Sequence, residues 1–155
     1  MKERFMEFRK EISEKLNNLL KNNLNSAEIY QKAFDKSESN DLKVFLRFRA
    51  KQRKRFADEL RIEVLRYGQI PEDDASFKTS LTKNWLDMKT LFSGHDERIV
   101  MEACLESDRK ALKDYEELIT EKNLPPTLDA LFTKHHQEIQ NAINKDKLFL
   151  QEAVA

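Results

Sequence analysis

The side chain that could do chemistry in this sequence is a carboxylate placed where an apolar residue is expected. Between residues 97 and 119, apolar residues recur at three- and four-residue steps, and Asp108 falls in the middle of the face that they form. A buried carboxylate without a partner is too costly to keep. Asp108 is therefore predicted to be either a metal ligand or one partner of a buried ion pair.

The metal interpretation requires further ligands on other helices. A dinuclear iron or manganese centre in a helical bundle uses a Glu from each of two helices and a Glu-x-x-His unit from each of the other two. This sequence contains no Glu-x-x-His, and its nearest approach is the reversed pair formed by His135 and Glu138. The residues left as candidates for a single metal ion are His135, His136, Glu138 and Asp108.

The second helical segment places basic and amide side chains where a di-metal protein would place ligands. Arg49, Gln52 and Arg53 fall on or beside its apolar stripe, and a guanidinium stays protonated and opposes divalent cations. The arginines could be buried, or their charged ends could reach solvent at the stripe edge. If they are buried, they predict a polar network in place of a metal site. Its members would be Asn23, Arg49, Gln52, Arg53, Asp108 and His135.

Other kinds of active site find little support in the sequence. Cys104 lies inside an apolar stripe and is predicted to be a buried structural thiol. No Gly-rich phosphate loop, paired cysteines or nucleophile elbow is present. Basic and acidic residues balance at 28 each, so neither nucleic acid nor a membrane is favoured as a partner. We expect no catalytic residue and no cofactor.

Four long amphipathic segments must position these residues. The apolar spacing predicts helices from near the N-terminus to about residue 38, from about 42 to 67, from 97 to about 123, and from 127 to about 152. Gly68 is placed to end the second helix, and Pro126 suits the first turn of the fourth. Within the connector 68–94, a short helix is predicted from about 76 to 92, anchored by Trp85.

These segments predict an all-α, ferritin-like four-helix bundle with a long crossover between the second and third helices. With 155 residues, two Gly, three Pro and 36% charged residues, the chain suits a single domain of long helices, residues 1–155. The crossover has to return along the bundle, so the second and third helices are expected to be parallel. Counting from the helix ends then puts the inward polar residues of the four helices roughly in one layer.

The segments LNNLL (16–20), FADEL (56–60), NWLDMK (84–89) and SGHDE (93–97) carry a resemblance to a known family. Together with the spacing from Cys104 to Tyr115, they are similar to the PA2169-type four-helix-bundle proteins. This bacterial family, domain of unknown function 2383, is placed in the ferritin-like superfamily. The resemblance covers about residues 16–150 and leaves residues 1–14 as an extension. Where members of the family often have Glu, this chain has Asp108. The resemblance implies a ferritin-like fold and no particular activity.

A structural or protein-interaction role without metal is the function that these observations favour, and we expect no enzyme activity. The alternative is a degenerate ferritin-like metal-binding protein or oxidase. The extension 1–14 would carry exposed Phe5, Met6 and Phe8 past the end of the bundle, which predicts a homodimer through this segment. A single cysteine and the absence of a signal-peptide pattern or a long apolar run predict a cytoplasmic protein.

Overall fold

The computed structural model describes residues 2–72, 97–121 and 123–154, with side chains described as far as residue 151. Over these ranges the protein is all-α, with four long helices and no strand. The chain divides into two compact units, Met1–His95 and Asp96–Ala155. The short helix predicted for residues 76–92, with Trp85, lies outside the described residues. None of the helices in the described ranges is long and apolar enough to cross a membrane.

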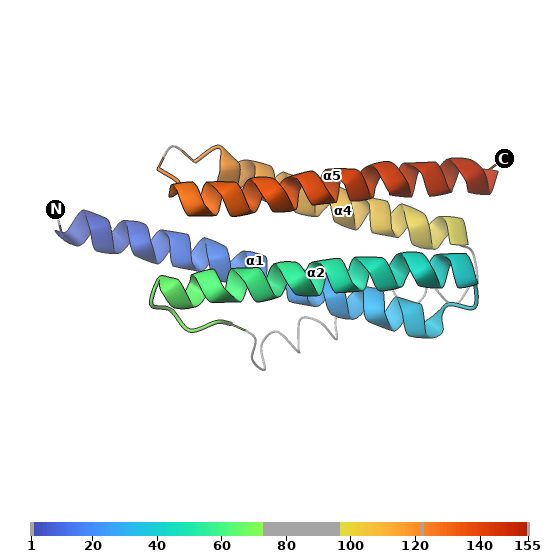
Figure 1. The fold of residues 1–155 in the computed structure, drawn as a ribbon, viewed down its shortest axis with the longest axis horizontal. Helices are drawn as coiled ribbons and strands as arrows, with labels where there is room; N and C mark the ends of the chain where they lie inside the picture. Colours follow the sequence, from blue (N-terminus) through green and yellow to red (C-terminus); the bar gives the residue numbers. More distant parts are fainter. Residues whose placement is uncertain (1, 73–96, 122, 155) are drawn as a thin grey trace. The chain divides into compact units, whose positions relative to one another are not determined.

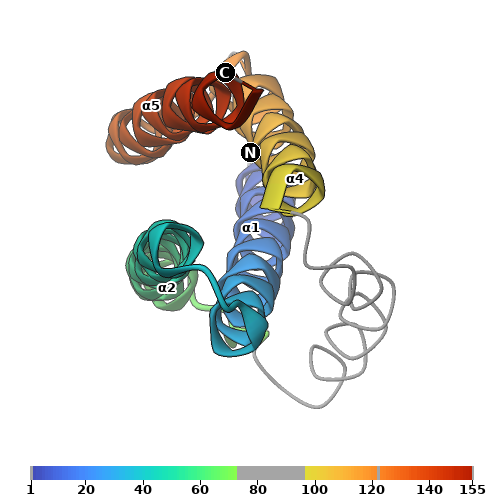
Figure 2. The same cartoon turned by 90° about the vertical axis from the view of Figure 1, so that its right-hand side faces the viewer.

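The first unit is built on an antiparallel hairpin of α1 (Lys2–Lys36) and α2 (Asn40–Arg66), which lie side by side (Figures 1 and 2). A three-residue connection joins them, and the Ser39 hydroxyl caps α2 by accepting a hydrogen bond from the Leu42 amide at 3.3 Å. Their facing stripes form the core of this unit. Its most deeply buried apolar members include Leu16, Leu20, Tyr30, Leu46, Phe56 and Leu60.

Gly68 ends α2, as the sequence predicts. Its φ of 76° lies in the left-handed region that glycine adopts without strain. The Gly68 amide donates to the Leu65 carbonyl at 3.0 Å, and the Gln69 amide donates to the Val64 carbonyl at 3.2 Å. This paired arrangement satisfies carbonyls that the last helical turn leaves without partners, and it turns the chain back toward α1.

The second unit is an antiparallel hairpin of α4 (Glu97–Ile119) and α5 (Pro126–Val154) (Figures 1 and 2). Pro126 is the first residue of α5, as predicted. The predicted end of α4 near residue 123 is about one turn too late. At this end the Thr120 amide still donates to the Glu116 carbonyl, whereas the Glu121 amide donates to the Leu118 carbonyl in a tighter turn, both at 3.2 Å. The sequence offered no Gly or Pro before residue 125 to mark this end. The unit packs around Met101, Leu128, Phe132, Ile139 and Ile143.

Candidate functional site

The two inward arginines of α2 are buried, which decides the question that the sequence left open. Arg49 and Arg53 are each 1% exposed and are among the largest fully buried side chains of the described residues. They stand at the spacing of the core face, between Leu46 and Phe56. Arg47, Lys51, Lys54 and Arg55 of the same segment are exposed. The segment therefore divides into an outer basic face and two guanidinium groups in the core.

Aromatic rings surround both guanidinium groups. The Arg49 Cζ lies 4.7 Å from the centre of the Phe45 ring and 5.9 Å from that of Phe48. The Arg53 Cζ lies 5.9 Å from the centre of the Phe56 ring. Contacts of this kind stabilise a cation by about 0.5–2 kcal/mol, more when the group is desolvated. They offset only part of the cost of moving a guanidinium out of water, so hydrogen-bonded partners are needed as well.

Asn23 on α1 provides one such partner. Its side-chain amide nitrogen donates to the Leu19 carbonyl at 2.9 Å, one helical turn back. This bond fixes the amide so that its oxygen is left for Arg53, whose Nη1 donates to it at 3.5 Å. Asn23 is 3% exposed. The structure thus brings together two of the six predicted network residues, from the two helices of the first unit.

Gln52 is also buried, at 6% exposed. Its Oε1 accepts no hydrogen bond from any group in the described part of the chain. Position 52 lies three residues after Arg49, which is close to one helical turn. Gln52 therefore shares the buried face of α2 with the arginines.

Asp108 on α4 is fully buried, at 0% exposed. Two positions away, the Glu106 side chain is 77% exposed and pairs with Arg109 at 3.5 Å across one turn. Cys104, one turn before Asp108, is a buried thiol at 1% exposed and is not part of a disulfide. The helical periodicity thus separates inward Asp108 from outward Glu106 as the sequence predicts, and Glu28 and Glu102 are exposed as well.

His135 on α5 forms a buried pair with Tyr115 on α4. The Tyr115 hydroxyl and the His135 Nδ1 are 2.8 Å apart, and the two residues are 1% and 0% exposed. Their rings meet edge to face at 5.5 Å, and Phe132 meets Tyr115 in the same manner at 6.1 Å. The tyrosine therefore engages one of the two ring nitrogens with which this imidazole could bind a metal ion. Sequence analysis did not include Tyr115 among the polar core residues.

The neighbouring histidine points elsewhere. His136 Nε2 lies 3.1 Å from Glu116 Oε1, and these side chains are 27% and 55% exposed. The two adjacent histidines therefore pair with two adjacent residues of α4, one in the core and one at the surface. Over the described residues, no three His, Cys, Asp or Glu side chains come together as a set that could hold a metal ion. The candidates His135, His136, Glu138 and Asp108 do not form such a set.

Asp146 on α5 is a second fully buried carboxylate, at 0% exposed, and sequence analysis missed it. The signal was present, because Asp146 follows Ala142 by four residues and Ile143 by three, the spacing of the inward face. Lys145 and Lys147 on either side are exposed. These two lysines make the segment read as a charged outer face.

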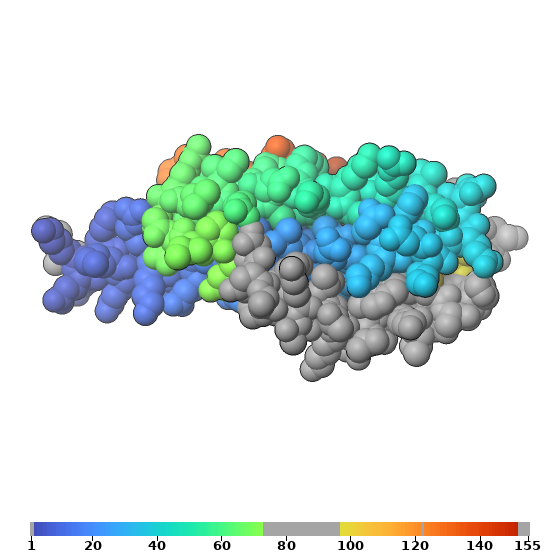
Figure 3. Space-filling model, turned by 90° about the horizontal axis from the view of Figure 1, so that it is seen from below, coloured from blue at the N-terminus to red at the C-terminus, as the bar shows by residue number. Residues whose placement is uncertain are grey.

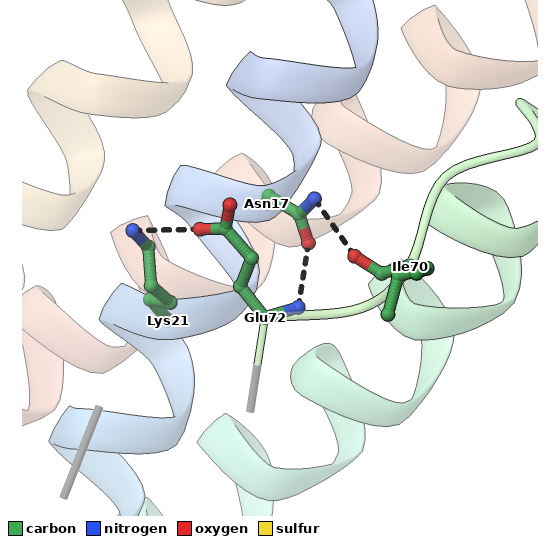
Figure 4. A network of polar contacts seen from close by, with 4 residues as sticks. All are labelled: Asn17, Lys21, Ile70 and Glu72. Carbon is green, nitrogen blue, oxygen red and sulfur yellow. Dashed lines mark hydrogen bonds and ion pairs between the residues drawn. The ribbon is translucent and has the colours of Figure 1, made fainter. Parts of the chain in front are cut away.

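A second polar arrangement, also missed, holds the segment that follows Gly68 against α1 (Figure 4). The Asn17 side chain donates to the Ile70 carbonyl at 3.2 Å and accepts from the Glu72 amide at 2.9 Å. Lys21, one turn along α1, pairs with the Glu72 carboxylate at 2.8 Å. Asn17 is 7% exposed and lies in the LNNLL segment. Its amide supplies one donor and one acceptor to an extended backbone, so it fixes the direction in which the chain leaves α2.

Comparison with known proteins identifies the family of this chain. The family described as Domain of unknown function (DUF2383) matches residues 11–121. This span is well over half of the chain and includes Asn17, Asn23, both buried arginines and Asp108. No protein with a curated description matches the chain. The resemblance stated from the sequence is confirmed: the chain belongs to the DUF2383 family.

Proposed function

We propose that this member of the DUF2383 family is a ferritin-like four-helix bundle in which a buried ionic network stands in place of a di-metal centre. Its role on this proposal is structural or protein-interacting, without metal, cofactor or catalytic residue. The observation that carries the proposal is the burial of Arg49 and Arg53 at 1% exposure on α2. In a di-metal bundle this helix contributes carboxylate or histidine ligands.

The charge of the buried residues supports an ionic network. The described residues include two arginines and two aspartates at 1% exposure or less, on α2 and on α4 and α5 respectively. A guanidinium remains protonated in the interior, so each needs an anion or several hydrogen bonds nearby. We propose that Arg49 or Arg53 pairs with Asp108. Asn23 would fix the orientation of the guanidinium, and Gln52 and His135 would complete the network.

This arrangement has a consequence for metal affinity. On this proposal the guanidinium groups of Arg49 and Arg53 lie near the carboxylates and oppose the binding of a divalent cation. The hydrogen bond to Tyr115 also occupies Nδ1 of His135, one of the two atoms with which the imidazole could bind a metal. A network of this kind adds little net stability compared with an apolar core, but it can fix how similar helices pair. We propose that the network fixes the register in which the helices pair. The buried single cysteine, Cys104, is compatible with a cytoplasmic location.

Metal analysis tests the proposal against the alternative of a degenerate metal-binding protein or oxidase. Protein purified without chelators is expected to contain far less than one iron or manganese per chain. Added Fe²⁺ in air is expected to develop no protein-dependent absorbance. The matched variant is Arg53→Gln, which removes one of the opposing positive charges, so its affinity for Fe²⁺ is expected to be no lower than that of the wild type. Near-stoichiometric iron or manganese in the wild type would overturn the proposal.

A further inference from the structure

At one end of the first unit, the N-terminal part of α1 extends beyond the C-terminal end of α2. Arg9 marks the level where α2 stops, because its Nη2 donates to the Arg66 carbonyl at 3.3 Å. Its guanidinium also lies over the rings of Tyr67 and Phe5, at 5.6 and 5.7 Å. Beyond this level α1 continues through Lys2–Phe8, about two turns or roughly 10 Å. The space-filling view shows this first part of α1, in blue, projecting past the green end of α2 (Figure 3).

The face of α1 that α2 covers continues into this projecting part. Ile12 and Leu16 on that face are 5% and 0% exposed, whereas Phe5, on the same face two turns before Ile12, is 59% exposed. Met6, beside it, is 69% exposed. Large apolar side chains gathered at one exposed end mark an interaction surface more often than isolated ones do. Phe8, which the sequence predicts to be exposed, is only partly so. The apolar face therefore lacks at Phe5 and Met6 the cover that α2 gives it further along.

We propose that this projecting part, Lys2–Phe8, binds the same segment of a second copy of the chain in an antiparallel, two-fold pair. This inference deepens the proposed interaction role and rests on it. A two-fold axis perpendicular to α1 makes the second α1 run antiparallel to the first, which is also the direction of α2. The second α1 thus takes the position that α2 would occupy if it were two turns longer. Each copy covers Phe5 and Met6 of the other with an identical surface.

Charge supports a second copy as the occupant. In this pairing the N-terminal end of one α1, which is the positive pole of its helix dipole and carries Lys2, Glu3 and Arg4, meets the C-terminal end of the other copy's α2. That end is the negative pole of the helix dipole. Arg66, the cation in the last turn there, is already paired with Glu63 at 2.8 Å. The chain as a whole has a formal net charge of zero, so two copies do not repel each other at long range.

Sedimentation of the full-length protein over a wide concentration range tests the inference. The wild type is expected to shift from monomer to dimer as concentration rises. The variant Phe5→Glu/Met6→Glu is expected to remain a monomer with unchanged helix content. Val44→Glu is the matched control, because Val44 is also an exposed apolar residue, 72% exposed, on the other helix of the hairpin. It is expected to dimerise as the wild type does. A wild type that stays monomeric, or a dimer that survives the double substitution, would overturn the inference.

The contact segment is tested by a single introduced cysteine, with the buried Cys104 left in place. Met6→Cys lies within the proposed contact and near its two-fold axis, so mild oxidation is expected to join two copies by a disulfide, and Val44→Cys is expected to remain unlinked. Equal linking of both variants would contradict a contact through Lys2–Phe8. Metal uptake by the wild type would overturn the proposed core and leave the dimer standing, whereas a monomer would overturn only the dimer.

Discussion

The two helical units bury polar groups of opposite kind. In the α1–α2 unit the groups at 1% exposure or less are guanidiniums, Arg49 and Arg53, set against aromatic rings and an asparagine amide. In the α4–α5 unit they are the carboxylates Asp108 and Asp146 and the imidazole of His135, which is bonded to Tyr115. Among the described residues at 1% exposure or less, the charged groups of each unit thus carry one sign, although Glu63 of α2 is buried at 9% exposure.

The difference in buried charge between the two units suggests a role for the charged residues at core positions. A hairpin with like charges in its interior is poorly stabilised by itself, because desolvated charges need counter-charges. Apolar stripes alone would let hairpins of similar length pair in several registers. On the proposed pairing of Arg49 or Arg53 with Asp108, a cationic face and an anionic face would favour one register over the alternatives, which is the use of buried ion pairs that has the best support.

The largest effect is expected from removing a buried anion. Asp108→Ala should lower the free energy of unfolding by about 3–5 kcal/mol, because on the proposed pairing it would leave a desolvated guanidinium without its counter-charge. Glu106→Ala, two residues away on the exposed face and paired with Arg109, should cost less than about 1 kcal/mol. Urea unfolding followed by circular dichroism measures both. Equal, small losses from the two variants would contradict a paired Asp108.

The double variant Arg53→Met/Asp108→Leu sharpens this test. If Arg53 is the partner, replacing both charges by apolar side chains should be far less harmful than the sum of the two single substitutions. Arg49→Met/Asp108→Leu is the matched control, and the pair that recovers more stability identifies the partner of Asp108. Losses that simply add in both doubles would show that neither arginine is coupled to this carboxylate.

A smaller effect is expected in the first unit, where Asn17 holds the segment after Gly68. Asn17→Ala removes two hydrogen bonds and should lower the free energy of unfolding by about 1–2 kcal/mol. The amide of Glu72, which donates to Asn17, should also exchange with solvent about tenfold faster or more, since roughly 1.4 kcal/mol of local protection is a factor of ten. Asn18→Ala, at the exposed neighbouring position, is the control. Unchanged exchange at Glu72 in Asn17→Ala would contradict the clamp.

The helices and the inward polar residues could be predicted because both follow from the helical period alone. Arg49, Arg53, Asp108 and His135 each occupy an apolar position of a long amphipathic segment, and all are at most 1% exposed. The same period would have identified Asp146, had its flanking lysines not suggested an outer face. In these helices, burial could therefore be predicted from the helical period when each inward position was judged by its spacing and not by the residues beside it.

Partners could not be predicted in the same manner. The pairing of Tyr115 with His135 depends on how α4 and α5 align across the turn near residue 123, and this alignment also sets His136 opposite Glu116. The Asn17 contacts join residues more than 50 positions apart, after a backbone turn whose direction the glycine at 68 permits but does not specify. Periodicity gives the face of each residue, and tertiary alignment gives its partner.

The smallest predicted effect concerns the half-buried Asp114 of the second unit, which differs from the fully buried Asp108 and Asp146. Burial raises the pKa of Asp114; Lys110 and Lys113 oppose this shift, and Glu117 adds to it. The folded protein thus holds the Asp114 proton more tightly than the unfolded chain does. The stabilising contribution is present below the ordinary pKa of 3.8 and is lost as the pH rises through the higher folded value. At neutral pH the ionised carboxylate therefore weakens the fold slightly.

Asp114→Asn should consequently be more stable than the wild type at pH 7, by less than about 1 kcal/mol, and the advantage should vanish toward pH 3. Glu106→Gln, at an exposed position of the same helix, is the control and should show no such gain. Asp108→Asn should behave in the opposite manner at pH 7 and destabilise the protein, because its charge is needed by a buried cation. If both aspartates stabilised the fold when neutralised, Asp108 would be an acid tolerated in the core and not the anion of a pair. The two carboxylates of α4, six residues apart, thus distinguish a charge that the fold uses from one that it only accommodates.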